Sequence, residues 1–339
     1  ASLLAAEEGD GILTNYILRR TLIAVPTLIM ISIAVFVVIQ LPPGDYLTSY
    51  IARLGERGAI VDQATVAALT KRYGLDRPLY VQYLKWAWGM LHGDFGQSFE
   101  WNRPVNTLIW ERLALTFAIS LGTLLFTWMV AFPVGLYSAL NQYSFGDYIA
   151  TFVGFIGVAT PGFMLALILM WVAYAFFGQS VGGLFSAEYI EAPWSMGKVW
   201  DMLKHMWIPV VVVGMSGTAG LIRTFRANLL DELNMPSVVA ARAKGVPERR
   251  LVLKYPVRIA LIPFVSTMGW SLPGLLSGET IISVVLGLPT TGPLLLGALQ
   301  SQDMYLAGSF IMILSFLTVL GTLVSDILLA ALDPRIRYD

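Results

Sequence analysis

One carboxylate, Glu279, stands within an otherwise apolar stretch, and its position gives it the strongest chemical interest in the sequence. A charged side chain that faces lipid costs about 2.5 kcal/mol or more, so such a residue normally faces a protein interior or a water-filled path. Two interpretations follow: Glu279 lines a translocation path, or it forms a structural pair with a neighbouring subunit. We favour the first, because ionisable groups at this depth usually mark a pathway.

Most other catalytic chemistry is excluded by residue type. The sequence has no cysteine, which excludes thiol catalysis, disulfides and thiolate metal sites. Its two histidines, His92 and His205, are far apart in the sequence, which argues against a metal site built on them. No Gly-rich phosphate loop ending in Lys-Ser or Lys-Thr occurs, so we expect no ATP hydrolysis by that route and no cofactor in this chain.

A serine in an apolar segment raises one enzymatic alternative. The run Gly214-Met215-Ser216-Gly217 resembles the nucleophile motif of rhomboid-type intramembrane proteases. Such a serine needs an adjacent base, and no histidine follows Ser216, while His205 lies at the outer edge of the same predicted span. Small residues that allow close helix packing explain the motif better.

A basic segment, 223–258, separates two blocks of apolar sequence. It holds eight Lys and Arg residues, a density that places a short loop on the cytoplasmic side of a membrane. Two interpretations remain open from the pattern alone: the charges only determine topology, or the segment is a docking site for a soluble protein.

Local signals within this segment predict two short helices. Asn234 is a candidate N-cap, Pro236 suits a first helical turn, and the Ala-rich stretch 238–244 favours a helix. Gly245 is suited to the left-handed conformation that ends a helix, and Pro247 then opens the second helix. We therefore expect an ordered pair of surface helices.

Composition places the chain among polytopic membrane proteins surrounded by a lipid bilayer. Of its 339 residues, 56% are hydrophobic and 13% are charged, and the mean hydropathy is +0.69. The net charge is zero, so no nucleic-acid partner is expected. We predict an all-α fold with six transmembrane helices, an extracytoplasmic helical insertion after the first and a cytoplasmic loop between the fourth and fifth.

This topology follows from apolar runs of about 20 residues and from the positions of Lys and Arg. It puts both termini in the cytoplasm. The predicted segments are a tail (1–14), the first span (15–41), the periplasmic insertion (42–112), the second span (113–143), the third span (148–177), a periplasmic loop (178–205), the fourth span (206–222), the cytoplasmic loop (223–258), the fifth span (259–286), a periplasmic loop (287–304), the sixth span (305–329) and a cytoplasmic tail (330–339).

Two helices are predicted within the insertion. The first runs from a cap at Asp62 to Tyr73, and Pro78 opens the second, Leu79–Leu91. The second helix carries four aromatic residues, Tyr80, Tyr83, Trp86 and Trp88. They are explained either by anchoring at the membrane interface or by contact with an external binding protein.

The basic segment resembles the loop by which membrane subunits of ABC importers hold their ATPase. Ala-Arg-Ala-Lys-Gly at 241–245, followed by Glu-Arg-Arg at 248–250, is similar to the dipeptide/oligopeptide permease branch. The general importer pattern has Glu where Val239 stands here. Further stretches similar to this branch are 18–20, 41–45, 74–79, 93–98, 259–263 and 278–282.

The resemblance implies the binding-protein-dependent permease subunit of an ATP-driven importer in the bacterial inner membrane. Its solute would be a peptide or a similar solute such as an oligosaccharide. It further implies a second homologous permease, two ATPase subunits that carry ATP and Mg, and a periplasmic or lipid-anchored solute-binding protein. The residues implied to contact an ATPase are Pro236, Val239, Ala240, Ala241, Arg242, Lys244, Gly245, Glu248 and Arg249. An ATP-independent secondary transporter or channel is the alternative, although such proteins usually carry more intramembrane ionisable groups.

Overall fold

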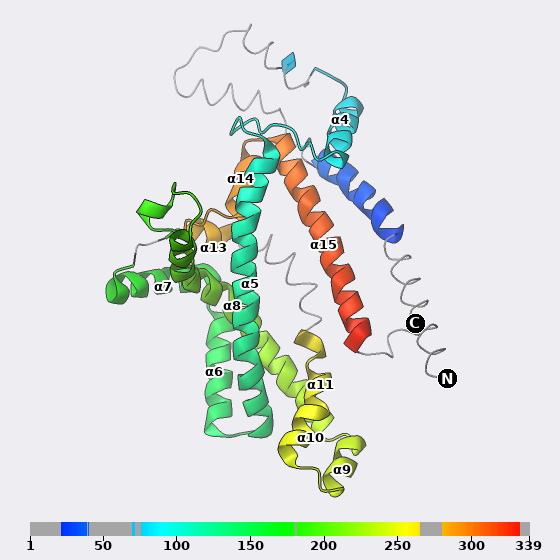
Figure 1. The fold of residues 1–339 in the computed structure, drawn as a ribbon, viewed down its shortest axis with the longest axis vertical. Coiled ribbons are helices and arrows are strands. Elements are labelled where there is room, and N and C mark those ends of the chain that lie inside the picture. The colour runs from blue at the N-terminus through cyan, green and yellow to red at the C-terminus, as the bar shows by residue number, and fades with distance from the viewer. Residues whose placement is uncertain are drawn as a thin grey trace. The chain divides into compact units, whose positions relative to one another are not determined.

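The fold was examined in a computed structural model, which describes residues 22–38, 40, 70–71, 76–179, 182–264 and 280–332 (Figure 1). Within these ranges the secondary structure is helical, with one isolated bridge between Gln97 and Pro104 and no strand. The expectation of an all-α protein is confirmed to this extent.

The helices follow one another in a simple order, beginning with the apolar helix Leu22–Val38. They continue as α4 (Leu79–Leu91), α5 (Val105–Leu140), α6 (Phe145–Ala159), α7 (Gly162–Phe177), the short 3-10 helix η1 (Ala187–Tyr189), α8 (Met196–Leu233), α9 (Pro236–Ala243), α10 (Glu248–Lys254), α11 (Pro256–Ala260), α13 (Thr280–Val285), α14 (Thr291–Gln300) and α15 (Met304–Leu332). The chain divides into two compact units, the first comprising 1–115 and 290–320, the second 116–289 and 321–339.

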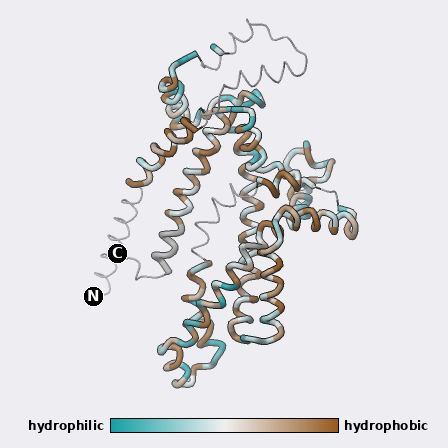
Figure 2. The backbone as a smooth tube through the Cα atoms, turned by 180° about the vertical axis from the view of Figure 1, so that it is seen from behind, coloured by the Kyte–Doolittle hydropathy of each residue, from teal (hydrophilic) through white to brown (hydrophobic). Residues whose placement is uncertain are grey.

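The described residues contain two to four candidate membrane spans. The helices Val105–Leu140 and Met304–Val324 are each long and apolar enough to cross a bilayer. Two further candidates are bent pairs, α6 with α7 and the two halves of α8. Figure 2 shows how strongly apolar residues dominate these helices. Residues 15–21 at the start of the predicted first span and residues 265–279 in the middle of the fifth lie outside the described residues, so the six-span topology stays a prediction.

The predicted third span, 148–177, is not one continuous helix. It is divided at Thr160 and Pro161 into α6 and α7, whose axes differ by 107°. Proline has no N–H to donate and disfavours the helical conformation at the residue before it, and Thr160 is accordingly extended, with φ −85° and ψ 123°. Pro133, by contrast, lies inside the continuous helix α5.

The helix around the predicted fourth span, 206–222, is longer than the apolar run. It begins after Ser195, whose hydroxyl accepts a hydrogen bond from the Lys198 N–H at 3.2 Å, and continues through Pro209 to Leu233. The helix extends beyond the apolar run at both ends because polar residues can also form helical turns and cap them. Residues 196–205, predicted as loop, are therefore its first turns.

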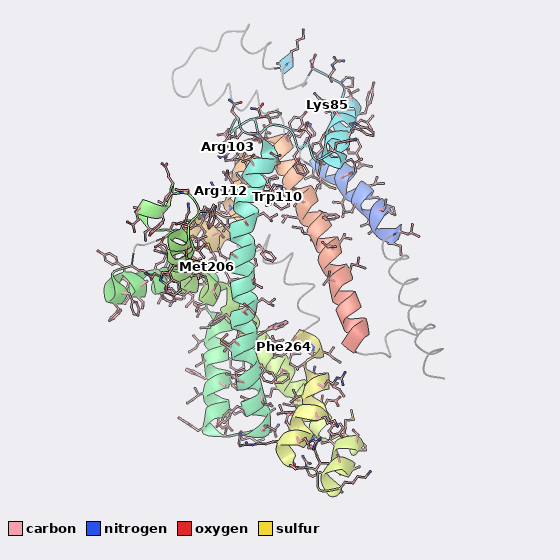
Figure 3. All side chains as sticks on the ribbon, viewed as in Figure 1. Lys85, Arg103, Trp110, Arg112, Met206 and Phe264 are labelled. Carbon is pink, nitrogen blue, oxygen red and sulfur yellow. The ribbon has the colours of Figure 1, made fainter. Side chains whose placement is uncertain are left out.

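An aromatic core joins α5, α8 and α11 in the second unit. The ring of Phe225 on α8 is fully buried and lies 5.6 Å from Phe132 and 5.3 Å from Phe264, centroid to centroid. Figure 3 labels Phe264, which follows α11. Trp128 contacts the same residue at 6.0 Å. Burial of several aromatic rings contributes strongly to stability, so these three helices are expected to move as one body.

A glycine makes this packing possible. A Cβ atom added at Gly135 on α5 would lie 2.7 Å from the Phe225 ring, whereas one added at Gly220 on α8 would meet nothing within 4 Å. We expect Gly135→Ala to destabilise the protein by about 1–3 kcal/mol through overpacking. Gly220→Ala should stabilise it by up to about 1 kcal/mol, because alanine is the better helix former.

Thermal unfolding of the purified membrane complex measures this pair of variants. Opposite shifts of the unfolding temperature are the expected result. Equal shifts in one direction would contradict the proposed contact between Gly135 and Phe225, since the two substitutions differ mainly in the space that the new methyl group meets.

The first unit contains a buried carboxylate that organises a loop. The Asp303 side chain is fully buried and accepts hydrogen bonds from the Ser98 hydroxyl at 2.5 Å and from the N–H groups of Phe99 at 2.8 Å and Glu100 at 3.1 Å. Its other oxygen accepts from the Leu306 N–H at 3.1 Å, which caps the start of α15. One carboxylate thus holds the segment 98–100 against α15.

Helix α4 occupies the bounds that the sequence predicted, Leu79–Leu91. Its aromatic residues divide into two groups. Trp86 is buried, and its indole N–H donates to the Ser309 hydroxyl at 3.3 Å, while Tyr83 packs on Phe36 at 5.4 Å. Tyr80 and Trp88 are exposed and remain available for either predicted role. The helix predicted from Asp62 lies outside the described residues.

Candidate functional site

The two surface helices predicted between the fourth and fifth spans are present as α9 and α10. Pro236 occupies the first turn of α9, and Glu248 begins α10 directly after Pro247. The predicted cap was wrong: Met235 precedes α9, and the Asn234 amide instead donates to the Leu230 carbonyl at 2.9 Å, at the end of α8. An asparagine side chain can equally bond to the turn behind it, and spacing alone does not distinguish the two partners.

A glycine turn separates these helices, as the sequence predicted. Gly245 has φ +76° and its N–H donates to the Arg242 carbonyl at 3.0 Å. The next N–H, of Val246, donates to the Ala241 carbonyl at 3.3 Å. Together these bonds form the Schellman arrangement, which requires a left-handed residue and therefore favours glycine.

An ion pair spans the turn and ties α9 to α10. Arg242 binds Glu248 through two contacts, Nη2 to Oε1 at 2.6 Å and Nε to Oε2 at 3.1 Å. The hydrogen bond from Arg242 holds the pKa of the Glu248 carboxyl below its ordinary value of 4.5. A carboxyl group with a lowered pKa stabilises the folded form above that ordinary value and loses this contribution as the pH falls further, so the pair persists at neutral pH.

The inner face of the helix pair is anchored in the aromatic core, and the outer face is exposed. Val238, Leu251 and Val252 are buried in the same cluster as Phe225. Eight of the nine residues implied to contact an ATPase are exposed, and Ala241 is half-buried. We call these nine residues the docking surface: Pro236, Val239, Ala240, Ala241, Arg242, Lys244, Gly245, Glu248 and Arg249.

Exposed apolar side chains beside the docking surface were not recognised from the sequence. Met235, Leu253 and Tyr255 are 44%, 56% and 39% exposed. An apolar residue in a short amphipathic helix is normally assigned to the buried face, and only the structure shows which ones remain outside. Exposed apolar residues among charged ones are typical of protein interfaces.

A second ion pair connects α8 to the first turn of α6. Arg226 donates to Asp147 through Nε at 3.2 Å and Nη2 at 3.0 Å, and the Tyr143 N–H donates to the same carboxylate at 3.0 Å. The sequence showed Arg226 only as one of many basic residues, and Asp147 only as part of a turn. Their pairing was not predicted because the two residues are separated by 79 positions.

Three residues considered from the sequence have different outcomes. Glu279 lies outside the described residues, as does the side chain of Ser216. His205 is buried on α8, and its Nδ1 lies 2.8 Å from the Asp201 carbonyl oxygen. Neither the path-lining role of Glu279 nor the protease alternative is therefore decided by side-chain geometry.

The helices and their exposed basic pair define the class as a polytopic helical membrane protein with a surface suited to a soluble partner. Comparison with protein families identifies the family within this class. Residues 131–338 match the binding-protein-dependent transport system inner membrane component, and residues 13–120 match the N-terminal part described for the same systems. The chain belongs to the family of binding-protein-dependent transport system inner membrane components.

Curated relatives align over almost their full length. The chain is 36% identical to the oligopeptide transport system permease protein AppB of Bacillus subtilis, over 95% of this chain and 99% of that protein. It is 32% identical to the oligopeptide permease protein OppB of Haemophilus influenzae and 30% identical to the glutathione permease protein GsiC of Salmonella paratyphi A, each over 96% of this chain and 99% of the relative.

These findings settle the class of activity. The protein is a multi-pass membrane permease subunit of an ABC importer and is not itself the ATPase, so it works with ATPase and solute-binding partners. The alternatives of an ATP-independent transporter and of an intramembrane protease do not agree with the family.

Proposed function

We propose that this chain forms half of the translocation path of an ATP-driven peptide importer. The relatives named for oligopeptides and glutathione support a peptide solute. The full proposal includes six spans, both termini in the cytoplasm, a second homologous permease as the other half, and two ATPases that hold ATP and Mg. A periplasmic or lipid-anchored binding protein delivers the solute from outside.

The docking surface is the observation that carries this proposal. It combines exposed basic and apolar side chains with an inner face that is buried in the core of the spans. Because α8 leads into the helix pair and α11 leads out of it, a force on α9 and α10 reaches both helices through the aromatic core. A rigid connection of this kind is what an ATPase needs to move a transport path.

The mechanism that we infer is alternating access. Closure of the ATPase pair on ATP moves the docking surface, and α8 and α11 follow because their rings are packed together. The path then opens outward and receives solute from the binding protein. In this scheme Glu279 lines the path, since a carboxylate within a span requires a polar environment.

Gly245→Leu tests the docking role. A non-glycine residue in the left-handed conformation costs about 1–2 kcal/mol, so the leucine should alter the angle between α9 and α10. We expect the reconstituted importer to hydrolyse ATP while taking up little peptide. The measurements are uptake of a labelled tripeptide into proteoliposomes and ATP hydrolysis in the same preparation.

Gly93→Leu provides the matched control. Gly93 also has a positive φ, +77°, and a Cβ atom there would meet nothing within 4 Å, as at Gly245. It lies outside the segment between α8 and α11. Normal uptake by the Gly245 variant would contradict the docking role. Equal loss of uptake in both variants would mean that backbone strain, and not docking, explains the result.

A further inference from the structure

A polar pocket of about 550 Å³ lies between the end of α7, η1 and the first turns of α8. All of its lining residues belong to the second unit. Its volume is within the range of sites that hold small molecules in proteins. None of the docking-surface residues lines this pocket, so it requires its own explanation.

The base of the pocket is a rigid network of buried polar groups. Asp201 accepts from the Ser186 hydroxyl and from the Ser186 N–H, both at 2.7 Å, and its backbone carbonyl oxygen lies 2.8 Å from His205. Both Asp201 and His205 are buried. These bonds hold the loop that carries η1 on α8.

A buried lysine secures the same loop on its other side. The Lys198 ammonium donates to the carbonyl oxygens of Ala192 at 2.6 Å and Ile190 at 3.3 Å. It also lies over the rings of Phe185 and Trp194, at 5.0 and 5.4 Å from their centroids. The loop is therefore held at both ends, and the groups that line the pocket are held in position before any ligand binds.

The rim of the pocket carries opposite charges beside aromatic surface. Glu188 and Lys204 both line it and are exposed, so a carboxylate and an ammonium are presented to the same space. Trp200, which is 62% exposed, and Tyr189 add aromatic faces. A ligand that matches this set carries a cation, an anion and an apolar group.

We propose that this pocket binds a short peptide with free ends as the peptide enters the translocation path. Glu188 receives the terminal ammonium, Lys204 receives the terminal carboxylate, and Trp200 contacts the apolar side chain between them. This inference rests on the proposed function, because it places the α7–α8 loop on the outer side and assumes a peptide solute.

A peptide fits this pocket better than a side chain of the binding protein does. A single side chain of a docked protein brings one charge, whereas this pocket offers both signs. An oligosaccharide without charge would bring no ion partner for either Glu188 or Lys204. The pocket chemistry therefore favours a zwitterion over a neutral sugar.

Direct binding to the assembled importer in nanodiscs, without the binding protein, tests the pocket. The probes are labelled Ala-Phe-Ala with free ends, with an acetylated N-terminus and with an amidated C-terminus. We expect each block to weaken binding by roughly three- to fivefold, the range for one exposed ion pair.

Two variants assign each end of the peptide. Glu188→Gln should abolish the effect of acetylation and leave the effect of amidation, and Lys204→Gln should do the reverse. Glu191→Gln is the matched control, because Glu191 is an exposed carboxylate on the same loop that does not line the pocket. Equal binding of free and blocked peptides by the wild-type importer would overturn the proposal, as would identical behaviour of all three variants.

Uptake measured in parallel, with the binding protein present, separates the two proposals. If Ala-Phe-Ala is transported but does not bind directly, the pocket proposal fails and the peptide importer remains. Direct binding without any ATP-driven uptake would contradict the proposed function instead. If neither is observed, both fail.

Discussion

Asp303→Ala is expected to destabilise the protein more than any other single change considered, by about 3 kcal/mol or more. The substitution leaves four donors without their acceptor: the Ser98 hydroxyl and the N–H groups of Phe99, Glu100 and Leu306. Each buried group that loses its hydrogen bond costs about 1–3 kcal/mol, and partial entry of water reduces the sum.

The position of Asp303 in the chain explains why the effect should be large. Burial raises the pKa of its carboxyl from the ordinary value of 3.8, and the hydrogen bonds from Ser98, Glu100, Leu306 and Phe99 oppose that rise. Three of the four donors come from a segment about 200 positions away, so the carboxylate closes a long-range contact that no local interaction replaces.

Thermal unfolding of the purified complex measures the loss, which should lower the unfolding temperature by roughly 5 °C or more. Asp94→Asn is the control, because Asp94 is exposed and accepts one hydrogen bond, from the Gly96 N–H. It should change the unfolding temperature much less. Similar shifts for both variants would show that the buried network does not carry the stability of this loop.

The second large effect is expected at the ion pair between Asp147 and Arg226. This pair ties α8, which leads to the docking surface, to the first turn of α6. Arg226→Gln leaves the Asp147 carboxylate buried without its cation, and Asp147→Asn leaves the guanidinium without its anion. We expect each variant to lower the peptide transported per ATP hydrolysed by roughly two- to thirtyfold, the range for residues that couple distant sites.

A double-mutant cycle distinguishes a direct pair from two independent effects. If the pair acts as a unit, the variant that carries both changes should be no worse than the poorer single variant. Arg223→Gln is the control, because Arg223 is an exposed arginine one turn earlier on the same helix. Additive losses, or an equal loss for Arg223→Gln, would contradict the coupling role.

Together these experiments separate stability from transmission. The Asp303 network belongs to the first unit and should affect unfolding, whereas the Asp147–Arg226 pair belongs to the second and should affect the ratio of transport to hydrolysis. Gly135→Ala tests the aromatic core, which contains Phe225, next to Arg226 in the chain, and Val238 of α9. A loss of coupling in that variant, beyond its loss of stability, would extend the proposed connection to α5.

Several features could be predicted because their causes are local in the sequence. Pro78, Pro236 and Pro247 mark the starts of α4, α9 and α10, since proline is tolerated at or just before a first helical turn. Gly245 is left-handed because the turn after α9 requires it. Long apolar runs predicted membrane spans because the bilayer thickness sets their length.

Other local signals were ambiguous in ways that only the fold resolved. Pro133 and Pro161 both stand in apolar sequence, yet the first lies within α5 and the second divides α6 from α7 by a bend of 107°. A helix that contains proline persists where its neighbours compensate for the lost hydrogen bond, and the neighbours are not visible in the sequence. The prediction that Asn234 caps α9 was wrong for a similar reason, because the fold decides which backbone group its side chain bonds.

The sequence by itself determined the class of protein, the helix pair and its exposed basic residues. Composition, charge and the proline and glycine residues that begin and end helices can all be read from short stretches of sequence. The tertiary structure alone decided which residues meet: Asp147 with Arg226, Ser98 with Asp303, and the groups that line the polar pocket beside α8. Such contacts join positions far apart in the chain, and their formation depends on how whole helices pack. One sequence without its fold contains no record of that packing.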